Sequence, residues 1–202
     1  SNEIGNLCAK LTNVDALDVM KGVHLDKRIS PKLPSGERLP APITTYLQAG
    51  CGFGGSCFPK DVNALIAYGN KLSQSMQLLK SVMDINREQP QEMIKRIFKH
   101  YPKMTGIKIA VLGLAFKPGT DDMRESPSIP IINELLSLKA KIYAYDPVAQ
   151  MEAKKYFKDN DIIYCSSVED SISEIEVVLL LTSWPEFSDL PKLFQKLNIN
   201  PI

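Results

Sequence analysis

The chain has 202 residues, of which 44% are hydrophobic, and its 24 basic and 23 acidic side chains nearly balance. This length allows one large or two small domains, and this hydrophobic content supplies a packed core, which excludes a largely disordered chain. No basic stripe points to nucleic acid as a partner, and no apolar run is long enough to cross a membrane.

The candidate metal ligands and nucleophiles are few: Cys8, Cys51, Cys57, Cys165, His24 and His100. No two cysteines have the Cys-x-x-Cys spacing of a zinc site, so we expect no bound metal. Reduced thiols, together with the lack of a signal-peptide pattern, lead us to expect a cytoplasmic protein. Cys8 and Cys165 stand among apolar residues and are expected to be small core side chains.

The first half of the chain is predicted to be helical. Apolar residues recur at helical spacing in residues 3–11, and a second short helix is expected between Asn13, as its cap, and Gly22, as its terminator. Residues 24–46 are rich in proline and are predicted to form a loop. Apolar residues at helical spacing also cover residues 73–101, where Pro90 either kinks one long helix or starts a second one.

The glycine-rich stretch from Gly50 to Asp61 is the main candidate for a reactive site. It reads Gly-Cys-Gly-Phe-Gly-Gly-Ser-Cys-Phe-Pro-Lys-Asp, which predicts a tight loop and then a helix at about residues 61–67. Cys57 would lie at the helix N-terminus, whose partial positive charge, together with Lys60, favours a nucleophilic thiolate. The alternative is that Cys57 is a small buried residue in a turn.

Two nucleophilic chemistries are compatible with a reactive Cys57. The Gly-Ser-Cys sequence superficially resembles the loop of papain-type hydrolases, but that chemistry needs a histidine well downstream, and only His100 follows the cysteine. Covalent capture of an aldehyde needs no histidine, so it is favoured.

The composition changes after residue 101, which predicts a helical domain at residues 1–101 and a second domain at residues 106–202. Strand patterns at residues 107–113, 141–145, 162–165 and 177–182 alternate with helical stretches. This alternation predicts an α/β domain with a parallel sheet covered on both faces.

Ligands of such a sheet bind at the carboxyl ends of its strands. The first of these ends is the long loop of residues 113–124, which lacks the Gly-x-Gly-x-x-Gly spacing of a dinucleotide site. Its Lys117 and Arg124 suit a phosphate group. The alternative is that these cations pair with Asp121, Asp122 or Glu125 on a solvated loop.

Two motifs resemble those of the UDP-glucose/GDP-mannose dehydrogenase family. Phe53-Gly-Gly-Ser-Cys-Phe-Pro-Lys-Asp61 is similar to the catalytic-cysteine motif, and Leu112-Gly-Leu-Ala-Phe-Lys-Pro-Gly-Thr-Asp-Asp-Met-Arg-Glu-Ser126 is similar to the second signature. The resemblance implies an all-helical central dimerisation domain followed by a Rossmann-like α/β domain that binds the nucleotide of the sugar. The family's N-terminal NAD-binding domain is expected to be missing, so this fragment alone is expected to be inactive.

The resemblance implies an NAD-dependent oxidation of UDP-glucose to UDP-glucuronate in two steps, through a thiohemiacetal and a thioester on Cys57. Asp61 corresponds to a carboxylate that positions and activates water. GDP-mannose or another nucleotide sugar is the alternative substrate, and a non-catalytic nucleotide-binding or dimerisation module is the alternative function. The implied partners are the nucleotide sugar and a second copy of the chain, which forms a homodimer through the helical domain.

The resemblance also assigns further site residues. Those expected near the cofactor are Cys57, Phe58, Pro59, Lys60 and Arg124. Those expected at the substrate are Arg28, Tyr46, Leu47, Gln48, Ala49, Gly50, Cys51, Gly52, Phe53, Gly54, Phe116 and Lys117. The segment Pro34–Thr45 lengthens the chain relative to the family pattern, so Arg38 competes with Arg28 for the role of reaching into a neighbouring subunit. Gln48 stands where the family often has lysine or asparagine.

Overall fold

The computed structural model describes residues 1–39, 41–157 and 162–202. Pro40, which belongs to the segment Pro34–Thr45, therefore lies outside the described residues. The chain forms two compact units, Ser1–Gly52 and Phe53–Ile202, and each is described by itself.

The first unit contains short helices joined by loops. Its elements are helix α1 (Asn2–Cys8), helix α2 (Ala16–His24) and the 3-10 helix η1 (Pro42–Leu47). Asp15, rather than Asn13, caps α2, because its carboxylate accepts a hydrogen bond from the Leu17 N–H at 2.8 Å. Asn13 lies instead in a left-handed turn with φ of 60°, and α2 continues through Gly22.

The segment between α2 and η1 folds back on itself. Lys32 and Arg38 face each other in an antiparallel bridge. Arg38 Nη1 donates hydrogen bonds to the carbonyl oxygens of Lys27 at 2.6 Å and Ser30 at 2.7 Å. Arg38 therefore braces this segment from within.

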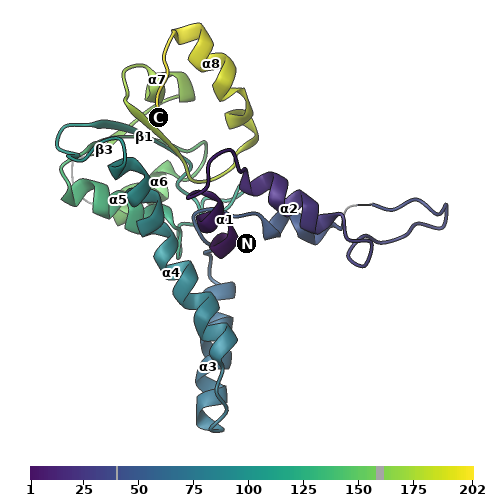
Figure 1. The fold of residues 1–202 in the computed structure, drawn as a ribbon. Coiled ribbons are helices and arrows are strands. Elements are labelled where there is room, and N and C mark those ends of the chain that lie inside the picture. The colour runs from purple at the N-terminus through teal and green to yellow at the C-terminus, as the bar shows by residue number, and fades with distance from the viewer. Residues whose placement is uncertain (40, 158–161) are drawn as a thin grey trace. The chain divides into compact units, whose positions relative to one another are not determined.

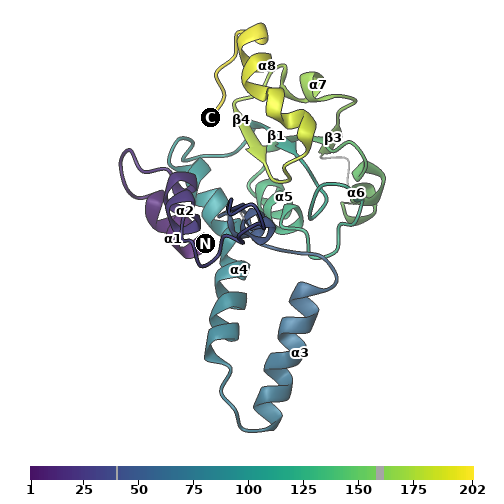
Figure 2. The same ribbon diagram turned by 90° about the vertical axis from the view of Figure 1, so that its right-hand side faces the viewer.

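The second unit begins with a helical hairpin, in which helix α3 (Phe58–Lys71) and helix α4 (Gln77–Phe98) run antiparallel, side by side (Figures 1 and 2). Helix α3 is longer than predicted at both ends. Pro59 occupies its first turn, where a proline's missing N–H costs no hydrogen bond. Pro90 lies inside α4, so residues 77–98 form one helix rather than two.

The described part of the second unit also holds a four-stranded parallel sheet in the order β3-β2-β1-β4. Its strands are β1 (Lys108–Leu112), β2 (Lys141–Tyr145), β3 (Ile162–Tyr164) and β4 (Val177–Leu180). The surrounding helices are α5 (Ser128–Ser137), α6 (Gln150–Tyr156), α7 (Val168–Ile172), the 3-10 helix η2 (Pro185–Asp189) and α8 (Leu190–Leu197). The prediction of a parallel α/β sheet is confirmed.

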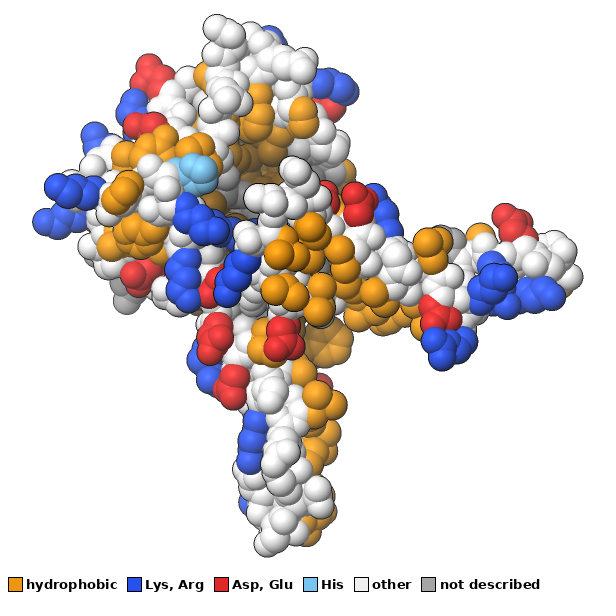
Figure 3. Space-filling view, in the orientation of Figure 1, with side chains coloured by type: hydrophobic (Ala, Val, Ile, Leu, Met, Phe, Trp, Pro, Cys, Tyr) orange, Lys and Arg blue, Asp and Glu red, His pale blue; other side chains and the backbone are white. Residues whose placement is uncertain are grey.

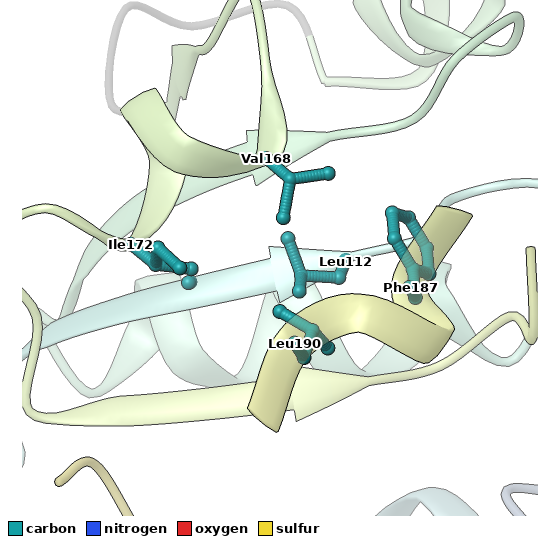
Figure 4. Close-up of a cluster of buried hydrophobic side chains, with 6 residues drawn as sticks. Leu112, Val168, Ile172, Phe187 and Leu190 are labelled. Atoms are coloured by element: carbon teal, nitrogen blue, oxygen red, sulfur yellow. The ribbon is translucent and has the colours of Figure 1, made fainter. Parts of the chain in front are cut away.

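Both faces of the central strand are buried, since Ile109, Ala110, Val111 and Leu112 have no exposed surface. On one face, the core cluster consists of Ala110, Leu112, Val168, Ile172, Phe187 and Leu190 (Figure 4). Helix α5 lies on the other face (Figures 1 and 2). Each fully buried aliphatic side chain contributes roughly 1.5–3 kcal/mol, and this core fixes where the loop after β1 begins.

The compact units and the predicted domains divide the chain at different places. Residues 53–101 were predicted to belong to the helical domain, yet they form one compact unit with the sheet. The physical reason is that helix α4 packs against helix α5 beside the sheet. The boundary between residues 101 and 106 stays a prediction.

Candidate functional site

Cys57 stands at the N-terminus of helix α3, and its side chain is exposed to solvent. Its carbonyl oxygen accepts a hydrogen bond from the Asp61 N–H at 2.8 Å. The helix therefore places Asp61 one turn after the cysteine, and 67% of the Asp61 side chain is exposed. The alternative of a small buried cysteine is wrong, because both groups are open to a bound molecule.

Polar and charged neighbours flank the thiol. The Ser56 hydroxyl lies 3.7 Å from the Cys57 sulfur. Lys60 Nζ lies 3.2 Å from Asp61 Oδ1, so a positive charge stands beside the carboxylate. Together with the helix N-terminus, Lys60 makes this end of α3 suited to anionic atoms.

Gly54 and Gly55 let the loop before helix α3 lie directly against the loop after β1. A Cβ atom on Gly54 would lie 2.1 Å from the Glu125 carbonyl oxygen, and one on Gly55 would lie 2.7 Å from the Phe116 ring. Gly55 also has a positive φ of 85°, and its N–H donates to the Arg124 carbonyl oxygen at 2.9 Å. The glycines are thus required by close contact as well as by backbone conformation.

Buried polar side chains hold the loop after β1 in place. The Asp146 carboxylate is only 1% exposed. It accepts hydrogen bonds of 2.7–3.2 Å from the backbone N–H groups of Leu114, Ala115, Val148 and Ala149 and from Trp184 Nε1. The hydroxyls of Ser126 and Ser128 donate to the Leu114 carbonyl oxygen, and that of Thr182 donates to the Ala115 carbonyl oxygen. The start of this loop is therefore rigid.

The predicted ligand residues follow on the same loop. Lys117 Nζ lies 5.4 Å from the centroid of the Phe116 ring. Arg124 forms a two-point contact with Asp122, with Nη2–Oδ2 at 2.8 Å and Nε–Oδ1 at 3.0 Å. Hydrogen bonding to Arg124 lowers the pKa of Asp122. Hydrogen bonding to Asp122 is the main cause that raises the pKa of Arg124.

A cavity of 470 Å³ lies beside Cys57, lined by α3, α4 and the loop after β1. The lining residues are Gly55, Ser56, Pro59, Lys60, Asn63, Met83, Asn86, Arg87, Arg124 and Glu125. Three of these side chains are cationic and one is anionic, which suits a ligand with phosphate groups. The cavity brings together the predicted cofactor residues Pro59, Lys60 and Arg124.

Asn86 of helix α4 is a residue of this site that the sequence patterns did not single out. Its Oδ1 accepts a hydrogen bond from the Phe53 N–H at 2.7 Å, and its Nδ2 donates to the Phe53 carbonyl oxygen at 2.9 Å. A polar residue on a helix ordinarily points to solvent. The one available signal was its helical spacing from Met83 and Pro90, which are buried on the same face.

The remaining predicted substrate residues belong to the first unit. Arg28 is exposed and pairs with Asp26, with Nη2–Oδ2 at 2.5 Å. Tyr46–Gly52 lie in and after η1, where the Gly50 N–H donates to Asn2 Oδ1 at 2.8 Å. Their contact with a substrate stays a prediction.

The part of the chain that the structure describes contains neither a cluster of metal-ligating side chains nor a membrane-spanning helix. In these ranges no three histidine, cysteine, aspartate or glutamate side chains are grouped so that they could hold a metal ion. Nor do the same residues include a helix of the length and apolar character that a bilayer span needs.

Both halves of the chain match one protein family. Residues 1–88 match the central domain of the UDP-glucose/GDP-mannose dehydrogenase family. Residues 110–202 match the UDP binding domain of the same family.

Individual proteins named as UDP-glucose 6-dehydrogenases are also similar to this chain. The UDP-glucose 6-dehydrogenase YwqF of Bacillus subtilis is 38% identical over 190 residues, which are 94% of this chain and 40% of that protein. The UDP-glucose 6-dehydrogenase AglM of Haloferax volcanii is 37% identical over 194 residues, which are 96% of this chain and 41% of that protein. This chain therefore spans about two fifths of the length of these relatives.

Solved structures are similar over most of this chain. A UDP-glucose dehydrogenase from Pyrobaculum islandicum has a TM-score of 0.79 at 35% identity, covering 92% of this chain and 40% of that one. A GDP-mannose dehydrogenase from Pseudomonas aeruginosa has a TM-score of 0.64 at 29% identity, covering 94% of this chain and 42% of that one.

Proposed function

Because this chain belongs to the UDP-glucose/GDP-mannose dehydrogenase family, we propose that it supplies the central and substrate-binding parts of an NAD-dependent nucleotide-sugar dehydrogenase. The proposed reaction is the oxidation of UDP-glucose to UDP-glucuronate. The observation that carries the proposal is the exposed Cys57 at the start of helix α3, beside the cavity and one turn before Asp61.

The proposed chemistry converts the C6 alcohol of the sugar to a carboxylate in two oxidations. NAD is the hydride acceptor in both. After the first oxidation, the Cys57 thiolate adds to the aldehyde carbon, and the new C–S bond forms a thiohemiacetal. Loss of a hydride from this carbon and of the proton from its hydroxyl group gives a thioester. Water then attacks the same carbon, the C–S bond breaks, and the acid and the thiol are released.

Each neighbouring side chain has a proposed part in this chemistry. Asp61 positions the attacking water, since its carboxylate is exposed one turn from the thiol. Phe116 and Lys117 contact the substrate, at a place fixed by the close approach of the Phe116 ring to Gly55.

The lining of the cavity fits the cofactor that the reaction needs. Lys60 and Arg124 supply cationic donors for its phosphate groups, as the chemistry of a dinucleotide requires. Phe58, next to Cys57, is 67% exposed and offers an apolar surface to a flat ring.

We further propose a homodimer that forms through the hairpin of α3 and α4. Leu65 and Tyr68 of α3 and Leu72, which caps its C-terminus, are 51%, 61% and 64% exposed and follow one side of the helix at helical spacing. Hydrophobic side chains run along one edge of this hairpin in Figure 3. An exposed apolar stripe of this kind is typical of a surface that a second copy covers.

The cytoplasm is the location we propose. Cys8, Cys57 and Cys165 are unpaired thiols, and such thiols persist in a reducing compartment.

Replacing the nucleophile tests the proposed activity. In the full-length protein, Cys57→Ser should lower acid formation at least ~10³-fold, because a hydroxyl without an adjacent base is a far weaker nucleophile. Acid formation is measured as product per time, and nucleotide-sugar binding is measured by calorimetry. Binding should stay within about twofold of wild type, since the hydroxyl keeps nearly the shape of the thiol. An equal loss of binding and rate would contradict the role of Cys57, and an unchanged rate would favour the non-catalytic module.

Binding of UDP and GDP to this chain separates the two substrate branches. Calorimetric titration with UDP, GDP, UDP-glucose and GDP-mannose should give a signal for the uridine nucleotides alone. Selective binding of the guanosine nucleotides would move the assignment to GDP-mannose.

A further inference from the structure

The amide of Asn86 pairs with the backbone of Phe53 in the way that one strand pairs with another. Its oxygen accepts from the Phe53 N–H at 2.7 Å, and its nitrogen donates to the Phe53 carbonyl oxygen at 2.9 Å. A single half-buried side chain thus satisfies both backbone groups of one loop residue. Helix α4 is by this contact tied directly to the loop that precedes Cys57.

Two aromatic rings connect Phe53 to the residue that follows Cys57. The Phe53 ring meets the Phe58 ring edge to face, with centroids 6.4 Å apart and an interplanar angle of 85°. Phe58 directly follows Cys57 and is the first residue of helix α3. Fixing Phe53 therefore fixes both ends of the short segment that carries the thiol.

The rest of that segment depends on the same support. Two glycines lie between Phe53 and Ser56, and glycine has the largest backbone freedom of any residue. The Gly55 N–H has one anchor, the Arg124 carbonyl oxygen at 2.9 Å. The thiol itself is exposed, and its sulfur lies 3.7 Å from the Ser56 hydroxyl. Its position must therefore come from the backbone rather than from packing around the sulfur.

We propose that Asn86 is a positioning residue for the Cys57 nucleophile, an inference that rests on the proposed function. Without the amide, the two backbone groups of Phe53 lose their partners and the glycines release the loop into many conformations. The thiolate then spends less time in line with the aldehyde carbon. Oxidation of the alcohol breaks a C–H bond and uses no thiol. The rate of the second oxidation should therefore fall more than the rate of the first.

The test measures the ratio of acid to aldehyde that the full-length protein forms from the nucleotide sugar. Asn86→Ala should lower acid formation from the nucleotide sugar about 10²-fold, since a misplacement of about 1 Å costs a rate of this order. The aldehyde should accumulate, and KM for the nucleotide sugar should stay within about twofold of wild type. The aldehyde is trapped with a hydroxylamine reagent and quantified by mass spectrometry.

Two further variants make the result specific. Asn86→Asp keeps the shape and the acceptor for the Phe53 N–H but places an oxygen against the Phe53 carbonyl, so it should also accumulate aldehyde. It covers the case in which the alanine variant does not fold. Asn70→Ala changes an exposed asparagine of helix α3, and it should keep the wild-type ratio of acid to aldehyde.

The outcomes separate this inference from the proposed function. Proportional loss of both oxidations, or an unchanged ratio in both Asn86 variants, would overturn the positioning role. Cys57→Ser is assayed in parallel. If it still forms acid, the proposed function itself fails. If it forms none while both Asn86 variants keep the wild-type ratio, the inference about Asn86 alone fails.

Discussion

The reactivity of each cysteine follows from where its side chain lies. Cys57 is exposed, whereas Cys8 and Cys165 are 5% and 4% exposed. Burial is the main cause that raises the pKa of Cys165 to about 11, and the thiolate is the form that reacts. We therefore expect iodoacetamide at pH 8 to modify Cys57 at least ~10²-fold faster than Cys8 or Cys165. Peptide mass spectrometry measures each rate, and fast modification of Cys165 would contradict its buried position.

The Asp146 carboxylate joins the loops that follow β1, β2 and β4. Asp146→Asn keeps the shape, but in either orientation its NH₂ group faces N–H donors that now bond to a carboxylate oxygen. The free energy of unfolding should fall by about 2–4 kcal/mol, since buried donors lose a charged acceptor.

Urea unfolding of this chain measures that loss. Asp189→Asn is the matched control, because the Asp189 carboxylate is 60% exposed in its pair with Lys192. Its effect should stay within about 0.5 kcal/mol. A loss for Asp146→Asn no larger than the control's would mean that its hydrogen bonds add nothing to stability.

At the level of single residues, the sequence predicted the reactive cysteine but not the side chains that hold the surrounding loops in place. Cys57 was identifiable because glycines, proline and charges beside it are local signals. Asn86 and Asp146 act through contacts with residues about thirty positions away in the chain. Local spacing carries no information about such partners, so Asp146 could be predicted only as the end of a strand.

The contact between the two site loops can be tested with two glycines of almost equal φ. Gly55 and Gly119 have φ of 85° and 80°. A Cβ atom on Gly119 would meet nothing within 4 Å, whereas one on Gly55 would lie 2.7 Å from the Phe116 ring. Gly119→Ala should cost about 1 kcal/mol of unfolding free energy from backbone strain alone. Gly55→Ala should cost about 1–3 kcal/mol more.

Denaturant unfolding of the two variants gives the difference directly. Equal losses would show that the Phe116 ring moves aside freely, and the loops would then not be tightly packed. Gly55→Ala combined with Phe116→Ala should recover the part of the loss that comes from the ring, while the strain of the positive φ remains.

Among the elements, the strands were the most predictable. Ile109–Leu112 is an apolar run because a parallel sheet covered on both faces buries the side chains of its central strand. Val177–Leu180, in the edge strand β4, is also apolar, although Leu180 is exposed there. The helix ends were less predictable. Helix α3 continues past Gly69, and the Met76 side chain packs closely against this glycine. A Cβ atom added to Gly69 would lie 2.5 Å from that side chain. No local sequence pattern signals this packing.

At the scale of the whole molecule, the sequence predicted a change from helices to an α/β part. It did not predict that Phe53–Ile202 forms one compact unit. The change in composition after residue 101 marks where strands begin. Compactness depends instead on which helices pack on the sheet, and α4 does so through α5.

The apolar stripe on α3 makes the proposed dimer testable. Leu65→Glu combined with Tyr68→Glu places two charges on that stripe, and the full-length dimer should dissociate at least ~10³-fold more readily, since burying unpaired charges costs several kcal/mol. Sedimentation velocity over a concentration series measures the dissociation constant. Ala67→Glu is the control, because Ala67 is exposed on the opposite side of the same helix, and its dimer should be unchanged. A dimer that survives the double substitution would place the interface elsewhere, whereas weakening by the control alone would point to the opposite side of α3.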